Sequence, residues 1–292
     1  MVSRSGFALI MTMLPRASGS PDPEGAQDLL VDGHVHCHSC FDRDEFFDHA
    51  AANLGAAAGV RGSVARCLML TESAGDHFFQ DLLEEVGGVG QEGWSVRTTA
   101  EDESVLVSRT GDTTIVVVAG TQIVTRERLE VLALGSRAEF GSGLSLSEAL
   151  SAVSASGAIP VIPWGFGKWW SARGRLVDAL LRGPVVPRFF LGDNGGRPRI
   201  APAPRLFQLA AERGVGVLPG SDPLPFPNQV CKVGGYGFAL RGAFSPDRPA
   251  ASVKRILAGL TRSPEPFGRR ESVPGFLRAQ IGMQWRLRSR IR

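Results

Sequence analysis

Three of the chain's five histidines lie within five positions, in the segment Asp32-Gly33-His34-Val35-His36-Cys37-His38. Side chains of an extended strand alternate between two faces, so His34, His36 and His38 would point to the same side. Imidazole nitrogens are common ligands of divalent transition metals, and two of them on one face can bind the same ion. The spacing therefore predicts a metal site that uses His34 and His36.

The elements around this segment alternate in a way that would place such side chains at one rim of a sheet. Apolar strand-like runs are expected at residues 29–35, 66–71, 158–162, 188–191 and 215–218, and helices at 45–58, 76–86, 146–156, 175–182, 204–213 and 250–260. Parallel βα repetition predicts a β/α barrel or a doubly wound sheet, and both folds bind ligands where the strands end. A small antiparallel β insertion is expected from three further β-type runs with short turns between them, which lie at 104–109, 113–119 and 129–134.

The segment Trp164-Gly165-Phe166-Gly167-Lys168-Trp169-Trp170 follows one of these strands and holds three of the five tryptophans. Its glycines allow a backbone to approach an anion, and Lys168 can act as a point charge for a phosphate or carboxylate. Trp164 can stack on a ligand, although the tryptophans can equally form a hydrophobic lid. We expect Lys168 and Trp164 to contact the substrate.

A polar segment, Asp193-Asn194-Gly195-Gly196-Arg197, follows the strand expected at 188–191 and should lie at the same rim. Asp193 could serve as a metal ligand or general base, and Asn194 and Arg197 could bind substrate oxygens. A simple Asn-Gly turn is the alternative.

Several segments follow one another in the order found in the polymerase and histidinol phosphatase (PHP) family. The strand that ends in His34-Val35-His36 resembles the first motif of that family, and Gly220-Ser221-Asp222 resembles its Gly-Ser-Asp motif on the final metal-binding strand. Three weaker likenesses lie between them, at residues 68–73, 120–135 and 159–165. The resemblance extends from about residue 29 to residue 223.

This resemblance implies a distorted β/α barrel of the PHP type and a metal-dependent hydrolase, with Asp222 completing a ligand set with the two strand histidines. Three family positions carry other residues here, since Ser73 and Ile162 replace histidines and Gln122 replaces a bridging Glu. A neutral amide cannot bridge two cations as a carboxylate does. One divalent ion, Zn, Mn or Fe, is therefore expected rather than the full trinuclear set.

Two more residues are candidates for the same site. Glu72 retains a carboxylate at the second strand end and could assist as a ligand or base. His77 lies five residues further on and could add a metal ligand, or it could belong to a helix start that Asp76 caps. The expected catalytic residues are thus Glu72, Asp193 and Lys168.

Phosphoester hydrolysis is the reaction that the resemblance implies. A divalent metal lowers the pKa of a bound water, and the resulting hydroxide would attack phosphorus while Lys168 or Arg197 holds the non-bridging oxygens. The residues leave two alternatives open. One is a mononuclear amidohydrolase that acts on a C–N bond, and the other is a degenerate PHP-like protein that binds or scaffolds without turnover.

The composition of the chain limits which partners and which cellular location we expect. The chain has 292 residues, 43% hydrophobic and 21% charged, which is usual for a globular protein. Its net charge of +3 is too weak to indicate nucleic acid, so we expect no specific nucleic acid. Lys168 and the PHP resemblance imply a small anionic substrate, for example a phosphorylated one. Four cysteines in a chain of this length favour a reducing, cytoplasmic location. A transmembrane helix is not expected, because no apolar run approaches about 18 residues.

Three segments are expected along the chain: a disordered leader at 1–27, a PHP-like barrel at 28–265, and a C-terminal helix with a basic tail at 266–292. The leader contains an apolar run, Phe7–Leu14, that could be a short signal peptide or part of an over-extended start. The tail carries an arginine at every second position from 286 to 292, and such charge runs are usually solvated.

Overall fold

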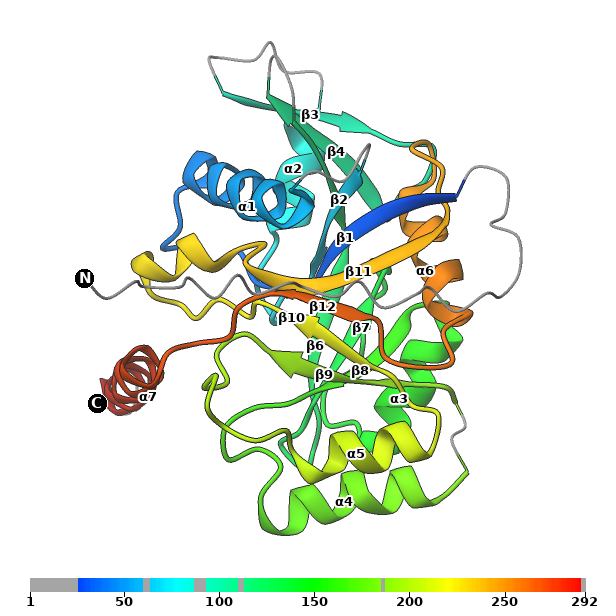
Figure 1. Ribbon diagram of the computed structural model, residues 1–292, viewed down its shortest axis with the longest axis vertical. Coiled ribbons are helices and arrows are strands. Elements are labelled where there is room, and N and C mark those ends of the chain that lie inside the picture. Colours follow the sequence, from blue (N-terminus) through cyan, green and yellow to red (C-terminus); the bar gives the residue numbers. More distant parts are fainter. Residues whose placement is uncertain (1–25, 60–63, 87–92, 110–112, 185–186, 290–292) are drawn as a thin grey trace, which may run out of the picture.

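The computed structural model describes residues 26–59, 64–86, 93–109, 113–184 and 187–289, so residues 1–25 of the expected leader lie outside the described part. Within that part the strands form two sheets, one of seven strands and one of five (Figure 1). The two sheets lie one beside the other, and helices cover their outer sides.

The first sheet is mixed. Its strands are, in spatial order, β12 (Glu265–Gly268), β11 (Tyr236–Ala243), β1 (Ala26–Val35), β2 (Val64–Leu70), β5 (Thr114–Val118), β4 (Ser104–Arg109) and β3 (Trp94–Thr98). The central strands β1, β2 and β5 are parallel, whereas the strands on both sides of them pair antiparallel. Leu29, Leu30 and Val31 are fully buried, as expected for a parallel strand covered on both faces.

The second sheet consists of β10 (Val217–Gly220), β9 (Phe190–Asn194), β8 (Ile159–Pro163), β7 (Glu130–Leu134) and β6 (Gly120–Val124), in that spatial order. Strands β8, β9 and β10 are parallel, and β7 is antiparallel to both of its neighbours. The start of β7 therefore lies at the same rim as the ends of β8, β9 and β10. This reversal brings Glu130 to that rim.

The two sheets meet along two short seams. At one seam the backbone N–H of Glu72 donates to the carbonyl of Gly120 at 2.9 Å, and the N–H of Gln122 donates to the carbonyl of Glu72 at 2.8 Å. At the other seam the N–H of Asp222 donates to the carbonyl of His34 at 2.8 Å. The second seam joins the end of β1 to the turn after β10.

The expected β/α barrel is not confirmed by this pairing. Among the described residues the strands form two separate hydrogen-bonded sheets, and the seams hold only isolated bonds between them. The pairing and the seams do not conflict with a distorted PHP-type barrel. A mixed α/β fold with both sheets around one interior is what the structure shows.

The helices lie close to the residue ranges predicted from the sequence. Helix α1 (Arg43–Ala58) begins at Asp42, whose side chain accepts hydrogen bonds from the N–H groups of Asp44 and Glu45. The remaining helices are α2 (Phe78–Glu84), α3 (Leu146–Ala155), α4 (Ser171–Arg182), α5 (Arg205–Glu212), the 3₁₀ helix η1 (Pro227–Lys232), α6 (Pro249–Ala258) and α7 (Val273–Ser289).

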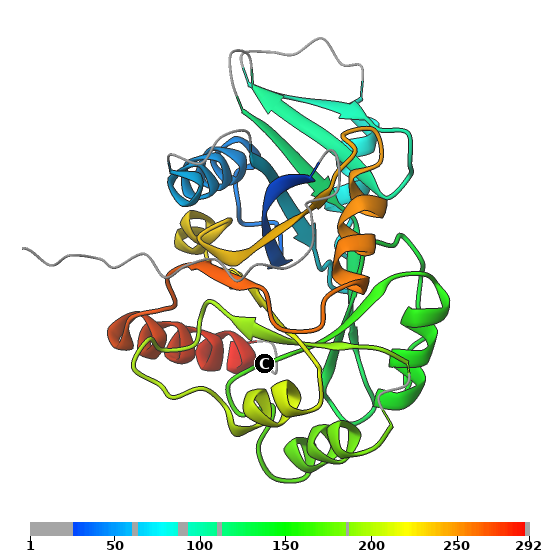
Figure 2. The same ribbon diagram turned by 45° about the vertical axis from the view of Figure 1, so that its right-hand side comes forward.

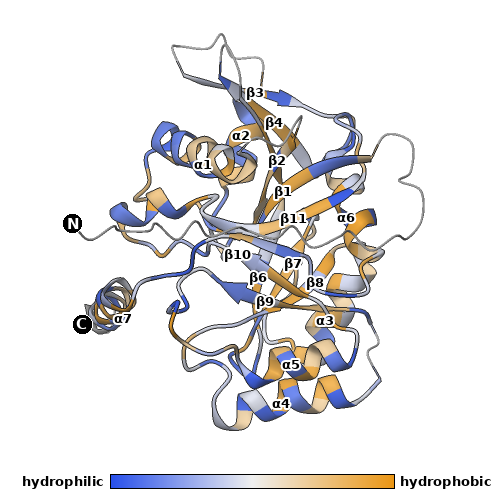
Figure 3. Ribbon diagram, in the orientation of Figure 1, coloured by the Kyte–Doolittle hydropathy of each residue, from blue (hydrophilic) through white to orange (hydrophobic). Residues whose placement is uncertain are grey.

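Buried apolar side chains form three clusters that fix these layers. One cluster packs α1 and α2 on the first sheet, and a second packs α3, α4 and α5 on the second sheet. The third lies between the sheets and includes Val31, Met69, Val161 and Phe238, with α6 closing one side. Figure 3 shows the same concentration of hydrophobic residues along the central strands, and Figure 2 shows α6 beside both sheets.

Two sequence-based expectations differ from the structure. The run at 129–134 forms β7 of the second sheet, whereas the antiparallel insertion consists of β3, β4 and β5. Strand β9 extends to Asn194, so Asp193 and Asn194 end a strand rather than follow it. Both differences arise because a short β-type run in the sequence predicts that a strand exists, but it does not predict where the strand ends or which strand it pairs with.

Candidate metal centre

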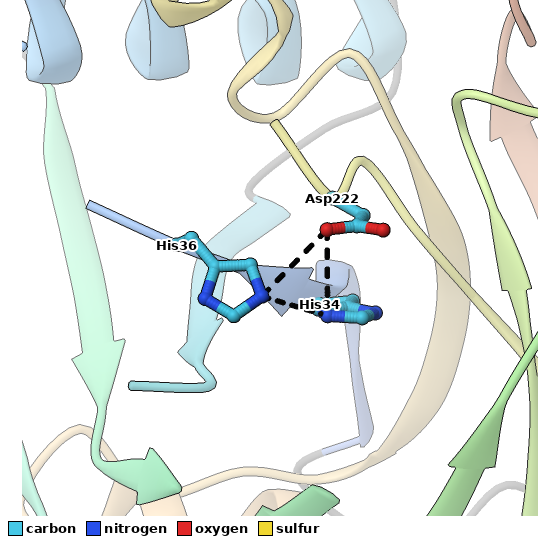
Figure 4. Close-up of side chains that lie close together, drawn as sticks. All are labelled: His34, His36 and Asp222. Carbon is cyan, nitrogen blue, oxygen red and sulfur yellow. Dashed lines mark hydrogen bonds and ion pairs between the residues drawn. The ribbon is translucent and has the colours of Figure 1, made fainter. Parts of the chain in front are cut away.

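Three predicted ligands converge on one point between the two sheets (Figure 4). The Nε2 atoms of His34 and His36 lie 3.1 Å apart, and each lies 3.6 Å from Oδ1 of Asp222. Within the described ranges this is the group of His, Cys, Asp and Glu side chains whose ligand atoms cluster closely enough for a metal ion. Strand β1 (Ala26–Val35) carries His34, His36 directly follows the end of that strand, and the turn after β10 supplies the carboxylate.

The spacing of these three atoms fits a transition metal. A triangle with sides of 3.1, 3.6 and 3.6 Å has a circumradius of about 2.0 Å, so one point lies at that distance from all three atoms. Zinc is bound by imidazole nitrogen at about 2.0–2.1 Å and by carboxylate oxygen at about 2.0–2.2 Å. The donor set is therefore matched to one divalent ion with open coordination positions.

The protonation states also suit a metal ligand set. Burial, with a smaller contribution from the neighbouring His34, lowers the pKa of His36 to about 3, so the imidazole of His36 is neutral at neutral pH. Burial raises the pKa of Asp222, but His34, His36 and Lys168 outweigh it and hold the pKa of that carboxyl below its ordinary value. Neutral imidazole and ionised carboxylate are the forms that bind metals.

Asp32 positions both halves of this set. Its buried carboxylate accepts hydrogen bonds from the backbone N–H groups of Ser221 at 2.8 Å, His34 at 3.3 Å and Gly234 at 2.9 Å. Burial raises the pKa of Asp32 to about 7, while these hydrogen bonds act against the rise. One side chain thus ties β1 to the turn that carries Asp222.

His38 lies on the same face as the other two histidines but is turned to a different partner. Its ring stacks on His36, with 5.4 Å between ring centroids, and its Nε2 donates to the carbonyl of Pro223 at 2.9 Å. Burial lowers the pKa of His38. The structure therefore places His38 beside the ligand set as a wall residue.

A cavity of about 370 Å³ opens above the ligand set and is lined by both His36 and Asp222. Two lysine–glutamate ion pairs stand on its walls: Lys168 with Glu130, and Lys232 with Glu271. Helix α7 closes another side with Phe276, Ala279, Gln280, Met283 and Gln284. Two of the chain's three lysines thus line the metal pocket.

The substrate-binding residues expected from the sequence divide into two groups. Lys168, Trp164 and Asn194 line the metal pocket. Lys168 is paired with Glu130, and the amide of Asn194 donates to Oδ2 of Asp222. Asn194 therefore contacts the ligand set directly, whereas Lys168 lies on the pocket wall with Glu130.

Asp193 and Arg197 lie just outside this pocket and bind each other. Arg197 donates from Nε and from Nη2 to the two carboxylate oxygens of Asp193, both at 2.7 Å, and both side chains are buried. The hydroxyl of Tyr236 also donates to Asp193 at 2.7 Å, and Arg197 reaches the carbonyls of Ala201 and Pro202. The predicted base and the predicted oxyanion-binding residue therefore form one buried ion pair.

Glu72 and His77 line a neighbouring cavity of about 680 Å³, which shares Ser73 and Gln122 with the metal pocket. Oε1 of Glu72 accepts a hydrogen bond from the backbone N–H of Phe79 at 2.9 Å, at the start of α2. Burial raises the pKa of Glu72. Neither residue joins the three clustered ligands in the described part of the chain.

Three pocket residues were missed from the sequence: Glu130, Lys232 and Glu271. Glu130 is the acidic first residue of an otherwise apolar strand, and its position at the rim depends on β7 running antiparallel. Lys232 and Glu271 lie far apart in the sequence, in η1 and just before α7, and no local pattern links them.

The chain was compared with known proteins. No family model matches it, and no curated protein matches its sequence. Its fold is similar to PsfC from Pseudomonas syringae PB-5123, with a TM-score of 0.53 and 17% identity over 88% of this chain and 98% of PsfC. Lower scores relate it to the lesion-specific endonuclease PfuEndoQ from Pyrococcus furiosus, with TM-score 0.47, 11% identity, and 80% of this chain but 56% of that one covered. For an Endonuclease Q complex with a 27-mer duplex substrate the TM-score is 0.44 and the identity is 14%. That match covers 80% of this chain and 57% of the Endonuclease Q chain.

One sequence-based expectation about partners is wrong. Endonuclease Q in that complex holds a nucleic acid duplex with an abasic lesion at its active site, which contradicts the expectation of a small anionic partner and no specific nucleic acid. That expectation rested on a net charge of +3, and a sum over the whole chain does not report the charge at one site.

The expected location and the expected family are each supported only in part. No helix in the described ranges is long and apolar enough to cross a membrane, while the expected cytoplasmic location stays a prediction. At 17% identity the likeness to PsfC concerns the fold alone, and membership of the PHP family stays a prediction from the sequence. The chain is thus distantly similar in fold to PsfC, and it has a His₂-carboxylate cluster where its two sheets meet.

Proposed function

We propose that this protein is a metal-dependent hydrolase that cleaves phosphoester bonds in the pocket above His34, His36 and Asp222. The observation that carries the proposal is the convergence of these three ligand atoms, with one point about 2.0 Å from all of them, on the floor of a cavity. The cavity walls also hold two lysines, each paired with a glutamate, whose ammonium groups could donate to the oxygens of a phosphoester.

The chain's own residues divide the work as follows. His34, His36 and Asp222 would hold one divalent ion, and such an ion, when bound, supplies Lewis acidity that activates water near neutral pH. Asn194 fixes the orientation of Asp222 through its amide hydrogen bond. Lys168 lies within the same cavity and can turn its ammonium group from Glu130 toward a substrate oxygen.

The buried pair of Asp193 and Arg197 has a supporting part in this proposal. Its polar atoms are occupied by each other, by Tyr236 and by backbone carbonyls, so neither side chain has a free atom to offer a substrate without breaking the pair. Because Asn194 directly follows Asp193 on β9, the pair would hold Asn194 against Asp222.

We propose phosphoesters as the substrate class, and this class includes the phosphodiesters of nucleic acids. Endonuclease Q, whose fold is related, acts on a duplex with an abasic lesion. This chain spans little more than half of the Endonuclease Q chains it matches, so that protein's substrate is a compound to test here and not an assignment.

The decisive experiment measures metal and activity together. Protein purified without chelator should contain about one equivalent of divalent metal, and His36→Ala should lose it, whereas His77→Ala should retain it. The parent is then assayed with bis(p-nitrophenyl) phosphate, p-nitrophenyl phosphate, an abasic duplex and an N-acyl amide. Full metal retention in His36→Ala would refute the ligand assignment.

The substrate panel separates the rival functions. Turnover of the amide and none of the phosphoesters would favour an amidohydrolase. Metal binding without turnover of any compound would favour a binding or scaffolding protein. Hydrolysis of a phosphoester that is lost on metal removal and restored by metal addition is the result that the proposal requires.

A further inference from the structure

Helix α7 carries a stripe of exposed apolar side chains. Val273, Leu277, Ile281 and Trp285 are 38%, 53%, 59% and 74% exposed, and each follows the last by four positions. A step of four residues turns a helix by about 40°, so the four side chains share one face about 120° wide. Four of the nine large apolar side chains found exposed in the described ranges thus gather on one helix.

The opposite face of α7 is the one that holds the helix to the protein. Phe276 packs edge-on against Phe166, with 5.1 Å between ring centroids, and Met283 lines the metal pocket. Gly282 lies so close to the ring of Phe226 that a Cβ there would meet it at 2.8 Å. Figures 1 and 2 show α7 at the margin of the molecule, and the exposure of the four stripe residues indicates that they lie on its solvent side.

The charge of this segment has one sign. From Ser272 to Arg292 the sequence contains five arginines and no aspartate, glutamate or lysine. Arg278 is exposed and lies beside the stripe. An apolar helix face that ends in a tryptophan, with an exposed arginine beside it in a segment whose charged residues are all arginines, is the composition of helices that lie in a membrane interface.

We propose that α7 docks on an anionic lipid bilayer, with Leu277, Ile281 and Trp285 inserted at the level of the headgroups and Arg278 contacting lipid phosphates. Trp285, the most exposed of the four, has an amphipathic ring that suits this level of a bilayer. This proposal concerns the outer face of α7 and does not depend on the reaction in the pocket.

Two other occupants fit the surface less well. A second copy of the chain that met α7 face to face would bring two arginine-containing segments together, with no acidic residue in either segment, 272–292, to compensate. A nucleic acid backbone would satisfy the arginines but would leave the apolar stripe in water. A bilayer with anionic headgroups offers an apolar layer and a negative surface together.

The test is co-sedimentation of the full chain with vesicles of phosphatidylglycerol and phosphatidylcholine, compared with vesicles of phosphatidylcholine alone. The expected result is binding to the anionic vesicles that weakens as salt is added. Ile281→Ser/Trp285→Ser should reduce the partition constant about tenfold or more, and Arg278→Gln should reduce it about fivefold. Leu176→Ser/Ile200→Ser, which changes two exposed apolar residues outside α7, should bind like the parent.

The melting temperatures of the variants are measured first, and they should match that of the parent because the substituted side chains are exposed. If the double variant is unstable, Trp285→Ser alone replaces it in the vesicle assay. Equal sedimentation with both kinds of vesicle, or unchanged binding by the stripe variants, would overturn the proposal. So would a parent dimer that the stripe variant converts to a monomer, or binding to a DNA duplex but not to vesicles.

Discussion

Asp222 donates its backbone N–H to the carbonyl oxygen of His34 over 2.8 Å, so the turn that carries the carboxylate is bonded directly to the end of the strand that carries His34 and leads into His36. Asp222 also has a φ of +46°, a left-handed conformation that non-glycine residues adopt at a cost of about 1–3 kcal/mol. Such a conformation persists because the bond to His34 and the bond from Ser221 to Asp32 hold the turn on both sides. The ligand geometry is therefore built into the seam between the sheets.

Gly220→Ala should disrupt this seam. A Cβ at position 220 would lie within 3.0 Å of the N, Cα and Cβ atoms of His34, so β1 and β10 would have to separate. We expect a loss of about 1–3 kcal/mol in the free energy of unfolding, as for other overpacked sites, and a fall in metal affinity of about tenfold or more. Denaturant unfolding and metal titration measure the two effects.

The matched control is Gly141→Ala, because a Cβ at Gly141 would meet no atom within 4 Å. That variant should behave like the parent in both measurements. Unchanged metal affinity in Gly220→Ala would mean that the seam does not set the ligand spacing.

Arg197→Ala should cost stability and leave the metal ligands in place. Arg197 and Asp193 are both buried, and removing one partner of a buried ion pair costs about 3–5 kcal/mol. Arg205 pairs with Asp178 at the surface, so Arg205→Ala should cost about 1 kcal/mol or less. Denaturant unfolding with metal analysis compares the two variants. A stable Arg197→Ala protein with a raised KM alone would instead return Arg197 to substrate binding.

Glu72→Gln should stabilise the protein at neutral pH. Burial raises the pKa of Glu72 above its ordinary value of 4.5, so the folded protein binds this proton more tightly than the unfolded chain does. The protein therefore loses stability as the pH rises through the raised pKa, and the variant does not. We expect a melting temperature higher by on the order of 2 °C at about pH 7.5, with the difference shrinking as the pH falls.

Glu139 provides the control for this measurement, since it is exposed at the same cavity and Glu139→Gln should not change the pH dependence. A Glu72→Gln variant that is less stable at neutral pH, or that holds less metal, would contradict the expectation. Either result would mean that the Glu72 carboxylate is ionised against a cation.

Local patterns in the sequence predict one half of the metal centre well. Alternation along a strand puts His34 and His36 on one face, and the structure has their Nε2 atoms 3.1 Å apart. The apolar runs and helix periods predict most elements to within a few residues, because burial and helix geometry act on neighbours in the chain. These signals need no knowledge of which segments meet.

The remaining features depend on which segments meet, and the sequence does not show that. Asp193 and Arg197 each suit a catalytic part, but the fold turns them toward each other and toward Tyr236, 43 positions away from Asp193. Likewise the pairing of Lys232 with Glu271 joins η1 to a residue two positions before α7, across 39 positions of sequence. Partner choice at such distances is decided by packing of the whole chain and not by any local pattern.

Lys168→Ala should weaken substrate binding more than it weakens the chemical step. Lys168 lines the metal pocket and can reach a substrate oxygen in both the ground state and the transition state, so KM should rise with a smaller change in kcat. A charge-assisted hydrogen bond is worth about 1.5–3 kcal/mol, so kcat/KM should fall about 10–150-fold with whichever phosphoester the parent hydrolyses.

The ion pair with Glu130 gives this prediction its controls. Lys168→Ala leaves the half-buried carboxylate of Glu130 without its partner, so part of any loss could come from stability or from repulsion of the substrate. Lys168→Met/Glu130→Gln removes both charges and should still show the raised KM, because the substrate contact is lost in either case. Lys254→Ala changes the chain's third lysine, which binds the carbonyl of Gly135 outside the pocket, and should keep the parent kinetics. If the double variant regains the parent KM while its melting temperature falls, Lys168 has a packing role and substrate binding depends on other groups in the pocket.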